Sequence, residues 1–348
     1  MAIPKIDSKQ MQNFLVELLN IPSPSGLTDN AIDFVDKEFS KLKNVSTRHT
    51  RKGALIITLA GEQNTAPRGL SAHVDTLGAQ VKIIKSNGRL QLSRVGGLSW
   101  NGVEGEGCTV FTRDGKAIRG SFMLIYSSAH VNGAKLGETK RSADTLEVRL
   151  DEKVTNADET RKLGIQEGDF VAFDPRVETV NGFIRSRHLD DKACVANLYG
   201  AAAALSKAGR KPRQTAHFLI SNYEEVGHGA ATGFPPEVGE LVVVDMAAVG
   251  DGQASDEYHT TICVQDSSGP YDYKLSNQLR SLADANKIPY KVDIYPNYGS
   301  DGSALLRTGA DIRVALIGPG VDASHNYERT HMDAMNATTQ WILAYLLS

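Results

Sequence analysis

The sequence lacks the features that define several classes of protein. It has three cysteines in 348 residues, Cys108, Cys194 and Cys263, and they are far apart and odd in number. This pattern argues against a disulfide framework or a zinc ribbon, and it fits a reduced, cytoplasmic protein. No apolar run is long enough to span a bilayer, and the first residues lack the apolar core of a signal peptide. We therefore expect a cytoplasmic protein with no membrane partner.

An excess of positive charge is also missing. The chain has 38 Lys and Arg residues against 41 Asp and Glu residues, which gives a formal net charge of -3. Proteins that bind nucleic acid or an anionic membrane usually carry a basic patch, so we expect neither partner. The hydrophobic share of 41% and the charged share of 23% are ordinary for a globular protein, and the length suffices for two domains.

The two ends of the chain show the alternation of helices and strands that is typical of an α/β domain. A helical pattern at 9–20, with Ser8 expected as its N-cap, opens the chain. The segment 76–180 is instead rich in glycine and in short strand patterns, with no long helical pattern. We expect an α/β domain built from 1–75 and 181–348, with a β-rich domain inserted between these parts.

A run of small residues from Ala193 to Leu205 is typical of a buried helix, and two adjacent carboxylates, Asp190 and Asp191, precede it. Two charges at the start of an apolar helix are costly unless positive charge faces them. A metal ion supplies more positive charge than a helix N-terminus does. The alternative interpretation is that Asp190 only caps the helix.

Side chains that can bind a metal also follow several apolar strands. One strand ends in His73 and Asp75, a second is followed by Glu224 and Glu225, a third by Asp245, and the last by a loop that leads to His331. In open α/β sheets, binding sites form beyond the carboxyl ends of the strands. The repeated placement of these residues at strand ends therefore predicts one convergent site.

The residue types at these positions suit a metal-dependent hydrolase. Imidazole and carboxylate ligands fit zinc, cobalt or manganese, and a two-metal site needs a carboxylate that bridges the ions. We expect Asp190 to bridge. We expect His73 and Asp245 to complete one metal site, and Glu225 and His331 to complete the other.

Two acidic residues are then left for other roles. Glu224 is expected to act as the general base, which takes a proton from the attacking water and passes it to the leaving amine. Asp75, two residues from His73, is expected to hold the imidazole in its orientation.

Each of these residues also has a plain structural interpretation. His73 and Asp75 can form an exposed loop pair, the two adjacent glutamates can lie in a solvated turn, and Asp245 can cap the segment that follows it. His331 can be a surface histidine, and the competing candidates for its role are His325, His228, His188 and His130. A serine hydrolase is disfavoured because the sequence has no Gly-x-Ser-x-Gly elbow.

In their order and spacing these motifs resemble one known family. The matching stretches are Pro22-Ser23-Pro24-Ser25-Gly26, Ser71-Ala72-His73-Val74-Asp75, Leu189-Asp190-Asp191-Lys192-Ala193, Glu224-Glu225-Val226-Gly227, Asp245, Gly299-Ser300-Asp301-Gly302 and His331. The chain is similar, almost end to end, to the di-metal aminopeptidases of metallopeptidase family forty-two. This family includes the tetrahedral (TET) aminopeptidases and bacterial glutamyl aminopeptidases.

The resemblance implies a zinc-peptidase-like α/β/α catalytic domain with an inserted β-barrel-like dimerisation domain. It implies the same ligands and the same base, with two divalent ions per subunit, zinc or else cobalt or manganese. It also implies removal of single residues from peptides with a free N-terminus, and a homo-oligomer built from dimers, up to a dodecamer. Asp301 is a candidate substrate-binding residue, or it is only part of a turn. One departure from the family is the shortened continuation His228-Gly229-Ala230-Ala231, which bears on substrate preference.

Other functions are compatible with the same residues. A two-metal deacylase or carboxypeptidase-like hydrolase would keep the ligands, but such relatives insert an α+β lid where this chain has β patterns. A glycosidase would need a pair of carboxylates without a metal. A non-enzymatic assembly protein on a decayed peptidase scaffold is disfavoured because every expected ligand position is present.

Overall fold

The computed structural model describes residues 3–348, which form two compact units, each with its own hydrophobic core. The α/β unit contains the chain up to Asp75 together with Arg176–Ser348, and the barrel unit is Thr76–Pro175. The second boundary lies before the expected residue 181. The reason is that strand β10 (Glu178–Val180) pairs with β11 (Phe183–Ser186) inside the α/β unit.

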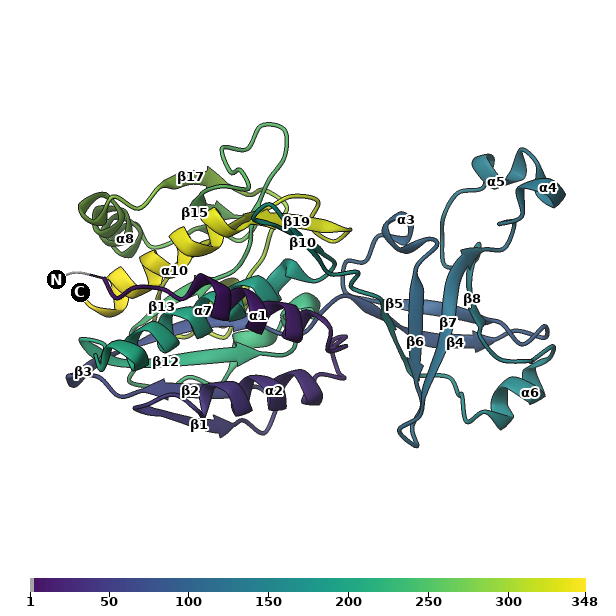
Figure 1. The fold of residues 1–348 in the computed structure, drawn as a ribbon, viewed down its shortest axis with the longest axis horizontal. Helices are drawn as coiled ribbons and strands as arrows, with labels where there is room; N and C mark the ends of the chain where they lie inside the picture. Colours follow the sequence, from purple (N-terminus) through teal and green to yellow (C-terminus); the bar gives the residue numbers. More distant parts are fainter. Residues whose placement is uncertain (1–2) are drawn as a thin grey trace. The chain divides into compact units, whose positions relative to one another are not determined.

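The α/β unit combines a large mixed sheet with a small three-stranded sheet (Figure 1). Its remaining strands are β1 (Val45–His49), β2 (Leu55–Leu59), β3 (Gln63–His73), β12 (Gln214–Ser221), β13 (Glu240–Val244), β14 (Ala247–Ala248), β15 (Thr260–Asp266), β16 (Gly269–Pro270), β17 (Tyr290–Ile294), β18 (Arg313–Val321) and β19 (Glu328–His331). Its helices are α1 (Ser8–Leu19), α2 (Asp29–Phe39), α7 (Leu189–Ala208), α8 (Tyr273–Asn286), α9 (Asp301–Arg307) and α10 (Met332–Leu346), with 3-10 turns η1 (Glu224–Val226) and η2 (Gly229–Ala231).

The large sheet has the order β1-β2-β12-β3-β13-β18-β15-β16, with β14 paired to β18 and β17 paired to β15. The central strands β12, β3, β13 and β18 all run parallel to their neighbours in this set. Their carboxyl ends therefore meet at one edge of the sheet, where an α/β fold places its binding site.

Alternating apolar residues let the sheet bury both faces. In β12, Phe218 and Ile220 join the core formed with the helices, whereas Leu219 between them packs on the opposite face. In β13, Val242 joins the helix side and Val243 joins the opposite core. Figure 1 shows α1, α7 and α10 side by side over the first of these faces. This layered arrangement confirms the predicted α/β/α fold.

The barrel unit is a closed barrel with the strand order β4-β5-β8-β7-β6-β9. Its strands are β4 (Gly78–Ile84), β5 (Leu90–Val95), β6 (Gly107–Phe111), β7 (Ala117–Leu124), β8 (Leu146–Leu150) and β9 (Phe170–Phe173). Its short helices are α3 (Trp100–Val103), α4 (Ala129–Asn132), α5 (Lys135–Glu138) and α6 (Ala157–Lys162). The predicted inserted β-barrel is therefore present, with one-turn helices in its connections.

Local capping differs from the prediction at α1. Asp7, and not Ser8, is the N-cap, since its side chain accepts a hydrogen bond from the Gln10 backbone N–H at 3.2 Å. The Ser8 hydroxyl instead donates to the Asn336 side chain.

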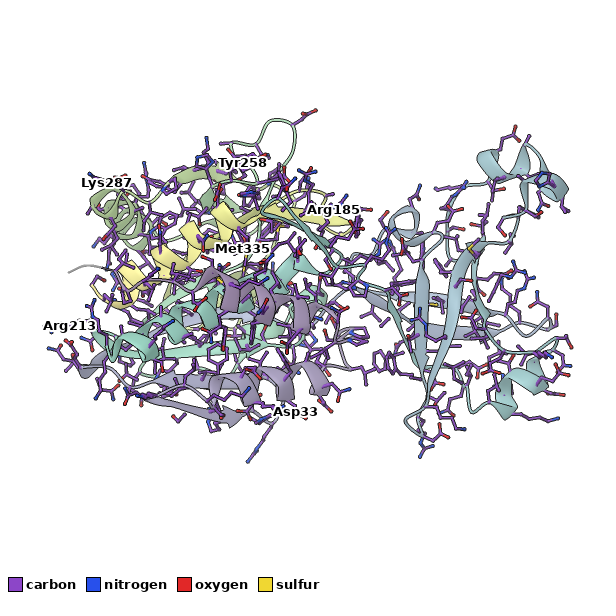
Figure 2. All side chains as sticks on the ribbon, viewed as in Figure 1. Asp33, Arg185, Arg213, Tyr258, Lys287 and Met335 are labelled. Carbon is purple, nitrogen blue, oxygen red and sulfur yellow. The ribbon has the colours of Figure 1, made fainter. Side chains whose placement is uncertain are left out.

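Figure 2 shows Met335 within the packed α/β unit, whereas Arg213 and Lys287 lie at its periphery. Apolar side chains inside and charged side chains at the surface are the usual distribution for a globular protein. Across residues 3–348, no helix is both long enough and apolar enough to cross a membrane.

Candidate functional site

Asp190 lies at the centre of the group of side chains gathered at the carboxyl ends of the parallel strands. It lies in the first turn of α7 with non-helical backbone angles, φ -73° and ψ 104°, so it does not simply continue the helix. Its two carboxylate oxygens face two different imidazoles. Oδ1 lies 3.2 Å from Nε2 of His73, and Oδ2 lies 3.5 Å from Nε2 of His325.

Two sets of potential metal ligands share Asp190. Among the described residues, His73, Asp190 and Asp245 form one group, and Asp190, Glu225 and His325 form the other. Within each group the ligand atoms all lie within 4.8 Å of one another. A carboxylate that belongs to both groups has the placement that a bridging ligand needs.

Strand ends deliver most of these groups. His73 is the last residue of β3, Asp245 follows β13 directly, and Glu225 lies in the turn after β12. His325 lies in the loop after β18, with a positive φ of 63°. The parallel order of the four strands therefore explains why residues far apart in sequence converge here.

His73 is oriented by the backbone as well as by its acidic neighbours. Its Nδ1 lies 2.9 Å from the main-chain carbonyl oxygen of Asp75, so the Nδ1–H donates there and Nε2 faces Asp190. The Asp75 carboxylate is farther from Nδ1, at 3.5 Å. That carboxylate instead accepts hydrogen bonds from the backbone N–H groups of Glu224 at 3.1 Å and Glu225 at 3.2 Å. Asp75 thus contacts both the histidine and the segment that carries the two glutamates.

The electrostatics of the cluster are dominated by crowded, buried carboxylates. Burial, followed by the negative charge of Asp190, raises the pKa of Asp245 to about 7. Burial also raises the pKa of Glu224 and of Glu225 well above the usual range, and neighbouring carboxylates add to the effect. At Asp190, burial acts in the same direction, but hydrogen bonds from His325 and His73 lower its pKa overall.

This donor set fits divalent metal ions. Buried carboxylates that repel one another are stabilised when a cation lies between them. The groups on hand are carboxylate oxygens and imidazole nitrogens, which suit zinc, cobalt and manganese. The three cysteines are buried, and neither ligand group contains a thiol.

Glu224 lies beside the first ligand group without belonging to it. Its Oε2 is 3.7 Å from Nε2 of His73, and its side chain is 15% exposed. A carboxylate that faces the ligands but is left out of both groups is placed as a general base would be.

His331, which the sequence suggested as a ligand, lies outside both groups. It ends β19, where Phe183 of β11 is its partner in the sheet, and it caps α10. Its Nδ1 accepts from the Asp333 backbone N–H at 3.1 Å, and Nε2 lies 3.3 Å from the Asn181 carbonyl oxygen. Both ring nitrogens of His331 contact the local backbone, and the imidazole that lies beside Asp190 and Glu225 is that of His325.

Asp301, the expected substrate-binding residue, is only 1% exposed. It opens α9, and its Oδ1 accepts a hydrogen bond from the Ala230 backbone N–H at 2.8 Å. The carboxylate is therefore directed at the segment after Glu224 and Glu225.

Two buried carboxylates near the site were not assigned a role from the sequence. Asp191 accepts a hydrogen bond from the His73 backbone N–H at 3.2 Å. Glu328 accepts from the backbone N–H of Asp190 at 3.1 Å and from that of His325 at 3.0 Å. The doubled aspartate at the helix start hinted at Asp191, whereas Glu328 has no sequence signal beyond an acidic residue in a polar loop.

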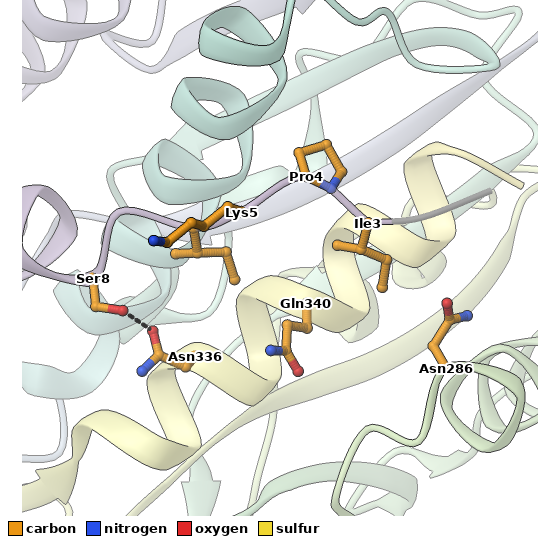
Figure 3. A pocket seen from close by; sticks show the side chains of 8 residues that line it. Ile3, Pro4, Lys5, Ser8, Asn286, Asn336 and Gln340 are labelled. Carbon is orange, nitrogen blue, oxygen red and sulfur yellow. Dashed lines mark hydrogen bonds between the residues drawn. The ribbon is translucent and has the colours of Figure 1, made fainter.

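A surface pocket of about 490 Å³ lies beside the start of the chain (Figure 3). It is lined by Ile3, Pro4, Lys5, Ile6, Ser8, Asn286, Asn336 and Gln340. None of the candidate metal ligands lines it, and Lys5 is its one charged lining residue, so it offers no set of groups for hydrolysis.

Comparison with known proteins identifies the family. The sequence model of the M42 glutamyl aminopeptidases matches residues 53–341. The chain is 47% identical over 341 residues to YhfE of Bacillus subtilis (strain 168), a candidate aminopeptidase, and the match covers 98% of each chain. The chain belongs to the M42 glutamyl aminopeptidase family. The predicted aminopeptidase activity class is thereby confirmed, and the deacylase alternative is not favoured.

Solved structures agree with the fold of an M42 peptidase. Aminopeptidase APDkam598 from the archaeon Desulfurococcus kamchatkensis superposes with a TM-score of 0.85 at 21% identity, covering 97% of this chain and 95% of that one. The TET1 peptidase of Pyrococcus horikoshii superposes with a TM-score of 0.83 at 21% identity, covering 97% and 99%. That peptidase is described as assembling into a tetrahedron or a large octahedral shell.

Proposed function

We propose that this M42 peptidase removes N-terminal residues from peptides with two divalent metal ions held by His73, Asp190, Asp245, Glu225 and His325. The observation that carries the proposal is the sharing of Asp190 between two ligand groups. Its two oxygens face one imidazole of each group, so this carboxylate is placed to bridge two ions.

The bound ions would polarise the scissile carbonyl and make water a stronger nucleophile at neutral pH. Glu224 would take the proton of the attacking water at its carboxylate and deliver it to the nitrogen of the departing peptide. His73 would keep Nε2 turned inward through its Nδ1–H bond to the Asp75 carbonyl oxygen. Asp191 would hold the backbone of His73 in place.

The surplus of negative charge supports a substrate with a free N-terminus. Beyond the five ligands, three more carboxylates lie at this end of the sheet: Glu224 beside His73, and Asp75 and Asp301 against the backbone of the segment 224–230. Such a field attracts the ammonium group of a peptide and disfavours a blocked terminus.

We also propose that the enzyme works as a homo-oligomer assembled from dimers, with the barrel unit as the dimer contact. The described assembly of the Pyrococcus horikoshii TET1 peptidase supports an oligomer of this type, and a dodecamer is the form we propose. Sedimentation of the purified protein would measure the assembly size. A monomer at micromolar concentration would contradict this part.

The activity is tested with a panel of aminoacyl-p-nitroanilides and their N-acetylated counterparts. Metal-loaded protein should cleave only the free-amine substrates, lose activity with a chelator and regain it with zinc, cobalt or manganese. Glu224→Gln should lower kcat by about 100-fold to 10,000-fold while the metal content stays unchanged. Hydrolysis that survives in Glu224→Gln with metals bound would show that Glu224 is not the base.

A further inference from the structure

The segment that carries Glu224 consists of two short 3-10 turns, η1 and η2. Such turns make few internal hydrogen bonds, so their position depends on what surrounds them. Asp75 holds the start of the segment through the backbone N–H groups of Glu224 and Glu225. The far end, from His228 to Ala230, is held by different residues.

Lys52 holds this far end from the turn that precedes β2. Its ammonium group donates hydrogen bonds to the carbonyl oxygens of His228 and Gly229, the latter at 3.0 Å. The same ammonium lies 5.4 Å from the ring centroid of Tyr223, and that ring stacks on the His228 imidazole at 5.0 Å with an interplanar angle of 20°. Lys52 therefore contacts residues on both sides of Glu224 in the sequence.

Asp301, which follows the segment in sequence, holds Ala230. Its Oδ1 accepts from the Ala230 backbone N–H at 2.8 Å. The start of α9 is itself fixed by a capping box between Ser300 and Ser303. Tyr271 anchors that box, since its hydroxyl lies 2.8 Å from the Ser300 hydroxyl. The carboxylate that meets Ala230 thus projects from a well-supported helix start.

The packing between these groups leaves no room for a side chain at residue 229. A Cβ added to Gly229 would lie 2.1 Å from Oδ1 of Asp301 and 3.0 Å from Cα of Glu224. Gly229 therefore lies in a tight space between the Asp301 carboxylate and the backbone of Glu224, which only a residue without a side chain fits.

We propose that Lys52 and Asp301 are positioning residues that fix the carboxylate of Glu224 for proton transfer by holding the carbonyl groups of 228–229 and the N–H of 230. This inference rests on the proposed function, because it assumes that Glu224 is the general base. Neither residue belongs to a metal ligand group, so neither supplies an atom to the ions, and the metal content of each variant reports whether Glu225 has moved with Glu224.

Lys52→Met is the primary test. It keeps the unbranched aliphatic part of the side chain and removes the donors, and the residue lies on a partly exposed turn. We expect kcat to fall by about 10-fold to 100-fold, with KM within about threefold and metal content unchanged, since a misplaced base slows chemistry without releasing substrate. The matched control is Lys9→Met, an exposed lysine on α1, which should keep wild-type kinetics.

Conservative variants separate position from charge. Lys52→Arg keeps donors for the two carbonyl groups and should recover most of the lost kcat. Asp301→Asn keeps an acceptor for the Ala230 N–H and should lose less than Asp301→Ala. If arginine fails to restore kcat above the Lys52→Met value, the carbonyl contacts are not what matters and the proposal is wrong.

A double-mutant cycle shows whether Lys52 acts through Glu224. In a Glu224→Asp background the carboxylate is already misplaced, so adding Lys52→Met should lower kcat by less than about threefold. A full, additive loss in that background would overturn the positioning role. Failure of the proposed function itself looks different, because Glu224→Asp and Glu224→Gln would then both keep high activity before Lys52 is changed.

Discussion

Buried charge is treated differently in the two units. In the barrel unit, Glu147 is 2% exposed, and it is paired with Lys85 at 3.0 Å and with Arg89. In the α/β unit, Asp245 is 4% exposed, and it faces other carboxylates and the His73 imidazole. The first arrangement is self-sufficient and serves stability, whereas the second leaves negative charge for a ligand to balance. The difference marks the site more clearly than burial alone does.

The largest effect is expected when the carboxylate shared by the two ligand groups, that of Asp190, is removed. Asp190→Ala should lose both ions, because Asp190 belongs to both ligand groups. Activity should fall by about 1,000-fold or more, since the remaining catalytic groups act only together. Kinetics and metal analysis of the same sample would measure the effect. Retention of two ions per chain by this variant would contradict the bridging role.

A smaller effect is expected from the carboxylate that supports the ligands without joining them. Glu328→Gln weakens its hydrogen bonds to the backbones of Asp190 and His325, so metal affinity should fall by about 10-fold to 100-fold. Competition with a chelator would measure the affinity. The nearby Glu257→Gln, which breaks an ion pair with Arg329, serves as control and should leave metal affinity as it is.

The sign of the stability change should differ between the two units. In metal-free protein at pH 8, Asp245→Asn should raise the free energy of unfolding by about 1 kcal/mol, because it removes a repelled charge. Glu147→Gln should lower it by about 1–3 kcal/mol, because it weakens bonds to two cations. Denaturant unfolding in the presence of a chelator would measure both free energies of unfolding. If the two variants changed stability in the same direction, the contrast between the two units would be wrong.

The gain at Asp245 should also depend on pH. Burial raises the pKa of Asp245 from 3.8 to about 7, so the unfolded chain loses this proton before the folded one does. The metal-free wild type therefore loses stability as pH rises through this interval. The advantage of Asp245→Asn should be nearly absent at pH 4 and fully present at pH 8. If the stability gain of Asp245→Asn did not change with pH, its cause would be packing and not the charge of Asp245.

The smallest effect is expected at the thiols. Cys108, Cys194 and Cys263 are all buried, and burial raises the pKa of Cys108 and of Cys263 to about 12. Cys108→Ser should therefore change activity by less than about twofold, and the native protein should react with thiol reagents only slowly. If thiol reagents labelled the protein rapidly and released metal, a cysteine would be a metal ligand. This result would contradict a site made only of carboxylates and imidazoles.

Much of the site followed from strand patterns that are local in the sequence. The apolar runs before His73, Glu224 and Asp245 each ended where a parallel strand ends, so convergence could be inferred without coordinates. The inserted barrel was also foreseeable, because its strands alternate and its helices are short.

The choice of histidine could not be predicted in the same way. β19 is a short polar strand, Glu328–His331, with no apolar alternation to reveal it. Its pairing with β11 draws His331 into the sheet and toward Asn181, and leaves His325 in the loop nearer the end of β18. That pairing is a tertiary contact between segments about 150 residues apart, which spacing within the chain does not disclose.

The most direct test of the account is the metal content of His325→Ala beside His331→Ala. The second variant also loses a helix cap, so the folded fraction of each sample should be measured with the metal. We predict two ions per chain in the wild type and in His331→Ala, and one in His325→Ala with activity lost. Two ions in His325→Ala together with one in His331→Ala would contradict the assignment of the second metal site.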